Sequence, residues 1–164
     1  MDYQAIIDKY YPSENELRRI LLVHSRQVAD RCLKIAKTHP ELMLDKEFLE
    51  EAAMLHDIGI CRCNAPSIQC MGTEPYICHG YIGGQMLRAE GWERHAQVCE
   101  RHTGTGLPGF EPETLEEQII CYADKFYSKT HLDRERTVLE AAQSLEKFGE
   151  DGVKRFLGWA KMFE

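Results

Sequence analysis

Apolar side chains recur every three or four residues along most of this chain, and that spacing places them on one face of a helix. The longest such stripe runs through residues 17–35, and shorter ones lie within 2–10, 45–56, 76–91, 92–102, 114–127, 134–148 and 151–163. No segment longer than a few residues has the alternating pattern of a half-buried strand. With 164 residues and neither a repeat nor a linker, the chain is predicted to form one domain, residues 1–164, an all-α bundle of about seven to eight helices.

Capping residues and glycine mark the predicted helix boundaries. Ser13, Asp45 and Thr114 are predicted N-caps, and Glu117, three residues after Thr114, completes a capping box. Gly59 is predicted to stop the helix that begins near residue 46 by taking its C′ position. Residues 14–130 are predicted to hold the functional core, and residues 134–164 are predicted to be two packing helices.

Three glycines, at positions 80, 83 and 84, interrupt the predicted helix over residues 76–91. Each weakens a helix by roughly 1 kcal/mol relative to alanine. Their presence predicts that another part of the backbone approaches this helix closely.

Most of the predicted helices carry a histidine or an aspartate on the apolar face or at its end. A single histidine there is usually a hydrogen-bonded core residue, but a buried carboxylate such as Asp124 is costly without a counter-charge or a metal. A core that buries four imidazoles and a carboxylate without a function would be unusual. The sequence therefore predicts a metal site. The candidate ligands are His24, His56, Asp57, His79, His102 and Asp124.

His56 and Asp57 are sequence neighbours at the end of a predicted helix. Neighbouring side chains on a helix point about 100° apart, but in the last turn they can converge on a point beyond the helix end. Both side chains are therefore predicted to reach one ion.

The stretch over residues 60–75 has no clear period and is rich in turn-forming residues, so it is predicted to be a loop and a candidate lid over the site. Cys61, Cys63 and Cys70 lie in it, and Cys78 follows it. Seven cysteines in a chain with no export signal at its amino terminus indicate reduced thiols. A separate thiolate metal site stays an alternative, although these cysteines lack the paired Cys-x-x-Cys spacing of structural zinc sites.

The formal net charge of −7 disfavours a nucleic-acid polymer as the partner, because the overall field repels polyanions. No apolar run approaches the length of about 20 residues that a membrane span requires. A cytoplasmic protein without membrane contact is therefore expected, and an oligomer is compatible with the sequence.

The order and spacing of the six candidate ligands resemble the HD-domain superfamily of metal-dependent phosphohydrolases, in the subset with an HDIG core, here His56-Asp57-Ile58-Gly59. The resemblance covers residues 24–129 and implies a helical bundle of the HD-domain type. Three short segments around the other ligands are most similar to small stand-alone bacterial HD proteins, among them diadenosine tetraphosphate hydrolases. These segments are His79-Gly80, Arg101-His102-Thr103-Gly104 and Tyr122-Ala123-Asp124-Lys125. The Gly-Tyr-Pro segment of HD-GYP cyclic-dinucleotide phosphodiesterases is missing from the sequence, which disfavours that activity.

The resemblance implies two divalent transition-metal ions. One ion would be held by His24, His56 and Asp124 and the other by His79 and His102. Asp57 would bridge both as the catalytic carboxylate. Mixed imidazole and carboxylate ligands suit iron or manganese, with nickel, cobalt or zinc as alternatives, better than calcium or magnesium. Two such ions generate hydroxide near neutral pH and neutralise charge on a phosphoryl oxygen.

Four residues near the ligands are predicted to contact the substrate. Lys125 follows Asp124, Arg101 precedes His102, and Arg62 lies in the candidate lid, so each is placed to meet a phosphate. The alternative for each is a solvent-facing charge. Thr103 opens the segment Thr103-Gly104-Thr105-Gly106, whose hydroxyl and amide groups lie beside the site but are no phosphate-binding fingerprint alone.

The sequence thus predicts a metal-dependent phosphohydrolase that acts on a small phosphorylated metabolite or a nucleotide. One alternative is a di-iron oxygenase, because some HD-domain proteins with the same ligand set cleave C–C or C–P bonds. A second alternative is a non-catalytic module that senses a ligand, which the complete set of six ligands disfavours.

Overall fold

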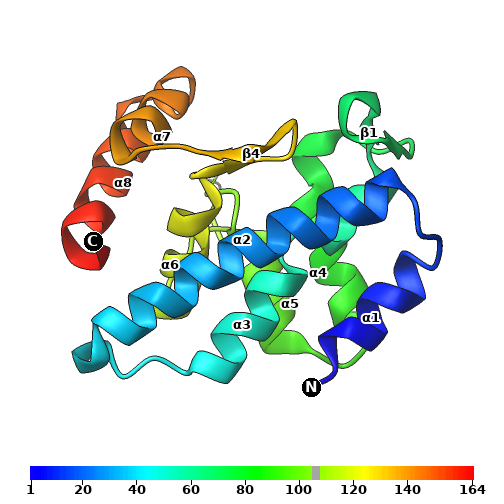
Figure 1. Ribbon diagram of the computed structural model, residues 1–164, viewed down its shortest axis with the longest axis horizontal. Helices are drawn as coiled ribbons and strands as arrows, with labels where there is room; N and C mark the ends of the chain where they lie inside the picture. The colour runs from blue at the N-terminus through cyan, green and yellow to red at the C-terminus, as the bar shows by residue number, and fades with distance from the viewer. Residues whose placement is uncertain (105–107) are drawn as a thin grey trace.

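The computed structural model describes residues 1–104 and 108–164. Over these residues the chain forms eight α-helices, with short 3-10 turns and two small antiparallel strand pairs (Figure 1). The α-helices are α1 (Tyr3–Tyr10), α2 (Glu16–Thr38), α3 (Lys46–Leu55), α4 (His79–Ala89), α5 (Glu93–Arg101), α6 (Leu115–Asp124), α7 (Val138–Ser144) and α8 (Glu150–Phe163). The 3-10 helices are η1 (Pro40–Leu42), η2 (Ile58–Arg62), η3 (Pro66–Ile68), η4 (Tyr76–Cys78) and η5 (Glu146–Phe148). The predicted all-α class, with seven to eight helices, is confirmed.

The long helix α2 organises the bundle. In Figure 1 it crosses the front of the molecule, and α3 packs along it. Helix α4 packs against α5, and α6 contacts α2, α5 and α8. One cluster of buried apolar side chains joins these helices, from Leu21 of α2 to Phe156 of α8. None of the described helices combines the length and the hydrophobicity that crossing a membrane requires.

Side-chain caps fix where the helices begin. Asp45 accepts a hydrogen bond from the Phe48 backbone N–H (3.1 Å), and the Thr114–Glu117 capping box is present, as predicted. The prediction for α2 was wrong, because Asn15 rather than Ser13 is its N-cap. The Asn15 backbone is extended and its side chain accepts from the Arg18 N–H (3.0 Å), which starts the helix at Glu16.

Gly59 has a different role from the one predicted. Helix α3 ends at Leu55, and Gly59 lies inside η2 without a positive φ, so it is not a C′ cap. A Cβ atom on Gly59 would overlap the His79 carbonyl oxygen and lie 2.6 Å from the Gly83 nitrogen. A Cβ on Gly83 would in turn meet the Cys99 sulfur, so the predicted close approach to this helix is confirmed. Glycine lets η2, α4 and α5 stack closely, which draws their functional side chains together.

The stretch over residues 60–75 is a folded hairpin rather than an irregular loop. Strands β1 (Asn64–Ala65) and β2 (Cys70–Met71) pair antiparallel around η3, and the side chains of Ile68 and Cys70 are buried. The prediction of a loop was wrong because these elements are too short to give a periodic pattern.

The first four residues of the predicted helix over residues 134–148 are also not helical. Strand β4 (His131–Glu135) pairs antiparallel with β3 (Tyr127–Ser128), and the Arg136 N–H donates to the Phe126 carbonyl (2.8 Å). Helix α7 therefore starts only after Thr137, which forms a capping box with Glu140. Helix α8 matches the last predicted helix.

We predict that Gly59→Ala destabilises the protein by about 1–3 kcal/mol, the usual cost of forcing a methyl group into packed backbone. Gly158→Ala is the matched control, because Gly158 lies in α8 with open space around its Cα, and alanine should raise the free energy of unfolding by about 0.5–1 kcal/mol. Chemical denaturation of both variants measures the two changes. Equal stability of the two variants would contradict the close packing of η2 on α4.

Candidate metal centre

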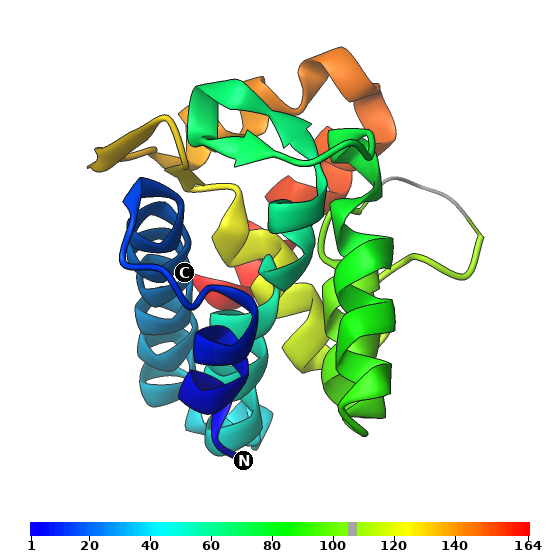
Figure 2. The ribbon, with the colours of Figure 1, turned by 90° about the vertical axis from the view of Figure 1, so that its right-hand side faces the viewer.

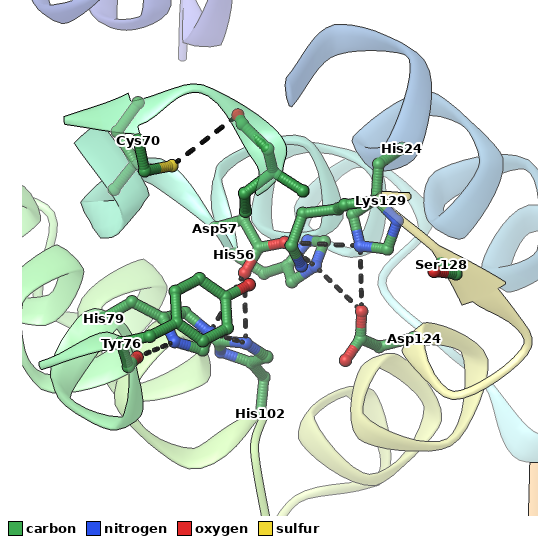
Figure 3. Close-up of polar contacts among 12 residues, drawn as sticks. His24, His56, Asp57, Cys70, Tyr76, His79, His102, Asp124, Ser128 and Lys129 are labelled. Atoms are coloured by element: carbon green, nitrogen blue, oxygen red, sulfur yellow. Dashed lines mark hydrogen bonds and ion pairs between the residues drawn. The ribbon is translucent and has the colours of Figure 1, made fainter. Parts of the chain in front are cut away.

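The structure brings the six candidate ligands to one place, most of them from helix ends (Figure 3). His24 comes from the middle of α2, whereas His56 and Asp57 follow the last residue of α3. His79 is the first residue of α4, His102 follows α5, and Asp124 is the last residue of α6. Their nitrogen and oxygen atoms form two groups, each with all ligand atoms within 4.8 Å of one another. The groups are His24, His56, Asp57 and Asp124, and then Asp57, His79 and His102.

Asp57 belongs to both groups and is completely buried. Its Oδ2 lies 3.2 Å from His24 Nε2 and 3.3 Å from His56 Nε2. Its Oδ1 lies 3.3 Å from the Nε2 atoms of both His79 and His102. One carboxylate oxygen thus faces each group, which is the arrangement expected of a bridging ligand.

Backbone carbonyls orient three of the imidazoles. His56 Nδ1 donates to the Ala53 carbonyl (2.6 Å), His79 Nδ1 to the Tyr76 carbonyl (2.5 Å) and His102 Nδ1 to the Cys99 carbonyl (2.5 Å). Each acceptor lies three residues before its histidine, so the helix end or the 3-10 turn supplies it locally. A proton fixed on Nδ1 leaves Nε2 available as a metal ligand, the usual outer-sphere arrangement of metal-binding histidines.

The donor set fits a metal ion. The Nε2 of His56 and the Oδ1 of Asp57 are buried and have no hydrogen-bond partner among the described residues. Buried polar atoms of that kind are rare because each costs free energy. Nitrogen and oxygen atoms that converge without partners match the ligands of a divalent transition metal. These histidine–aspartate groups therefore support divalent metal binding.

The electrostatics of the centre follow from burying several charged groups together. Burial opposes protonation of His56, but the adjacent Asp57 and Asp124 outweigh it and raise the pKa of His56 to about 10. For His102 burial prevails and lowers the pKa to about 4. Burial alone would raise the pKa of Asp57, yet the charges of Lys129 and His56 bring it well below its usual value. Asp57 is therefore ionised, and positive charge gathers around it.

Lys129 is a residue of this centre that the sequence did not reveal. Its ammonium group donates to Asp57 Oδ2 at 2.6 Å, and its side chain is only 13% exposed (Figure 3). Lys129 lies in the turn between β3 and β4, five positions after Asp124. No periodic pattern marks that turn, and only the fold shows that it reaches back to Asp57. The ring of Tyr76 also packs against this centre, because it stacks on His79 with ring centroids 4.4 Å apart.

A cavity of about 770 Å³ opens beside the ligands. His79, His102 and Asp124 line it, and so do two of the predicted substrate residues, Thr103 and Lys125. The Lys125 ammonium donates to the His102 carbonyl (3.1 Å) and lies 3.3 Å from Asp124. Gly104 also lines the cavity, whereas Thr105 and Gly106 of the predicted segment lie outside the described residues.

The other two predicted substrate residues do not line this cavity. Arg101 donates to both carboxylate oxygens of Glu117, at 3.0 and 3.1 Å, and so ties α5 to α6. Arg62 is the last residue of η2, and its side chain is exposed. The prediction of phosphate contacts thus has no geometric support for Arg101 and Arg62.

The cysteines form no comparable centre among the residues that the structure describes. Groups of three or more ligand-type side chains within 4.8 Å contain only histidine and aspartate. Burial also raises the pKa of Cys63 to about 11 and that of Cys70 to about 12, so both are thiols at neutral pH. The alternative of a separate thiolate site therefore receives no support.

We predict that Lys129→Gln destabilises the metal-free protein by about 1–3 kcal/mol, because Asp57 loses a buried charged hydrogen-bond donor. The change in stability is measured as the melting temperature of the chelator-treated protein, before and after manganese is added. The variant should gain more from manganese than the unmodified protein does, since the ion replaces the lost positive charge. Lys34→Gln, at an exposed position of α2, is the control. An identical response of both variants would contradict the role of Lys129.

Comparison with known proteins adds a family and two relatives. A family model described as HD domain matches residues 21–128. The tRNA (cytidine(56)-2'-O)-methyltransferase of Thermoplasma volcanium is 28% identical over 149 residues, which cover 82% of this chain and 39% of that protein. The protein of the same name from Picrophilus torridus is 25% identical over 161 residues, which cover 85% of this chain and 42% of that protein. The chain thus spans about two fifths of the length of these curated relatives.

No solved structure matches the chain. The family match covers more than half of the chain and contains every member of the two ligand groups. The chain therefore belongs to the HD domain family, which places it in a superfamily of metal-dependent hydrolases.

Proposed function

We propose that this protein is a metal-dependent phosphohydrolase that acts on a small phosphorylated metabolite or a nucleotide. The observation that carries the proposal is the shared carboxylate of Asp57, which joins two groups of buried ligands beside a large cavity. When bound, two ions at such a ligand set would supply an activated water and neutralise charge on a phosphoryl oxygen. Iron or manganese is the expected metal, with nickel, cobalt or zinc as alternatives.

The charge of the cavity supports a phosphorylated substrate. Lys125 and Lys129 lie next to the ligands and present ammonium groups to the same space. Arg136, Lys147 and Arg155 add three more basic side chains to the lining, against the acidic groups of Glu111, Asp124 and Asp151. A basic cavity on a chain with a net charge of −7 favours a small anion over a polymer. In this proposal the two lysines bind and orient the phosphate.

The activity named for the two curated relatives is not part of the proposal. This chain spans only about two fifths of their length, so the named methyl transfer need not involve the shared part. A centre of four histidines and two aspartates is also suited to metal-dependent hydrolysis.

We predict that Asp57→Ala removes all bound metal, because Asp57 faces both ligand groups. His79→Ala and His102→Ala should remove at most one of two ions, since each belongs to a single group. Elemental analysis of the protein purified without chelator measures the stoichiometry. His131→Ala is the control, because His131 is exposed on β4. Equal metal loss in the three ligand variants would argue against a bridging role of Asp57. The absence of metal above trace in the unmodified protein and in every variant would contradict the proposed function.

We further predict metal-dependent release of phosphate or nucleotide from a panel of nucleoside monophosphates, dinucleoside polyphosphates and sugar phosphates. Lys125→Gln should raise KM about 10-fold or more while the metal content stays unchanged, because a charged hydrogen bond to phosphate contributes about 1.5–3 kcal/mol. The panel is run with manganese and with iron, in air and without oxygen. Oxygen consumption on a phosphonate or a polyol, with no hydrolysis of any phosphate, would favour the di-iron oxygenase instead.

A further inference from the structure

The mouth of the cavity carries large apolar side chains that the core does not use. Ile77 of η4 is 73% exposed and Phe148 of η5 is 76% exposed, yet both line the cavity. Single exposed apolar residues are common on protein surfaces. Two of them on separate elements at the mouth of one charged cavity indicate a place for an apolar part of a ligand.

The backbone around Phe148 holds this side chain outward. Gly149 follows it with a φ of 108°, a conformation that suits glycine, and the chain then turns into α8. The Lys147 ammonium lies 5.2 Å from the centre of the Phe148 ring. An aromatic face and a positive charge are thus presented together. In Figure 2 the orange helix α7, which precedes η5, and the green segment that leads into α4 both lie at the top of the molecule, whereas Figure 1 shows α7 at the left and α4 right of centre.

The cavity is charged at its buried end and carries large apolar side chains at its exposed end. The metal ligands and the ammonium groups of Lys125 and Lys129 lie at its inner end, whereas Ile77 and Phe148 lie at the mouth. A ligand that matches both ends has a phosphate at one end and a flat apolar group at the other. Nucleotides have this form, because every base offers a π-face for stacking on an aromatic side chain. A sugar phosphate has no group that would use the mouth.

We propose that the mouth of the cavity binds the base of a nucleotide, with Phe148 as the stacking residue and Ile77 as a second apolar contact. The inference rests on the proposed function, because it places the phosphate of the same ligand beside the metal centre. Phe148 lies in the C-terminal part of the chain, outside the residues 21–128 that match the family model. Specificity for the base would therefore come from this chain's own C-terminal elements.

Trp159 provides a direct test by binding. The chain has two tryptophans, and Trp159 lines the cavity whereas Trp92 does not. The full chain with Trp92→Phe therefore reports on the cavity through a single indole. We expect at least one of AMP, GMP, CMP and UMP to change its fluorescence in chelator-treated protein, with ribose 5-phosphate binding about 5- to 100-fold more weakly, the range that base stacking on an aromatic ring supports.

Variants in the same background locate the contact. Phe148→Ala should weaken binding of the tightest nucleotide about 5- to 100-fold and leave ribose 5-phosphate unchanged. Ile77→Ala should have a smaller effect of the same kind. Leu139→Ala is the matched control, because Leu139 on α7 is also largely exposed but does not line the cavity. Circular dichroism confirms that each variant is folded.

Three results would overturn the inference: equal affinity for nucleotide and ribose 5-phosphate, no nucleotide binding at millimolar concentration, or equal effects of Phe148→Ala and Leu139→Ala. The binding assay needs neither metal nor turnover, so it separates this inference from the proposed function. Selective nucleotide binding without any phosphate release would sustain the inference and reject the hydrolase. Hydrolysis of sugar phosphates and nucleotides at equal kcat/KM, with no effect of Phe148→Ala, would support the hydrolase and reject the base-binding site.

Discussion

The structure depends on the buried carboxylate of Asp57 and on the positive charge gathered around it. A completely buried carboxylate is costly unless charged or hydrogen-bonded partners surround it. Four imidazole Nε2 atoms lie within 3.3 Å of its oxygens, and the Lys129 ammonium lies at 2.6 Å. These partners come from five separate segments, so the charge balance is satisfied only when the whole bundle has assembled. Divalent ions would meet the same electrostatic demand, which is why one set of contacts serves both folding and the proposed chemistry.

Helix ends supply most of this centre for a physical reason. The last carbonyls of a helix have no partner within the helix, and the Nδ1 groups of His56 and His102 donate to such carbonyls. That local hydrogen bond fixes the ring and directs Nε2 toward Asp57. Glycine at position 59 then lets η2 approach the start of α4 more closely than a side chain would allow. Backbone geometry therefore sets the positions of the ligands, and the side chains add their chemistry.

The sequence allowed the helices and the candidate ligands to be predicted because both depend on local patterns. Apolar periodicity marks the faces that pack, and the amphipathic stripes already contained His24, His79, His102 and Asp124 as polar exceptions. The role of Lys129 depends on a contact across 72 residues, and no local pattern reports such a contact. The contact of Arg101 with Glu117 could not be predicted for the same reason, since it lies across a helix interface. The hairpin over residues 60–75 was missed because two-residue strands have no measurable period.

The C-terminal helices show how packing and function can share one element. By their pattern α7 and α8 are amphipathic packing helices, and Phe156 of α8 is indeed stacked on Tyr122 of α6 in the core. The same segment turns Arg155 toward the cavity, where its guanidinium pairs with Glu111 and lies 4.8 Å from the centre of the Trp159 ring. The apolar face of α8 packs in the core, and this packing places other side chains of the same helix along the cavity. The ligands of the centre lie within the family match, whereas these side chains of α8 lie beyond it, so a packing segment outside the matched residues completes the cavity beside the centre.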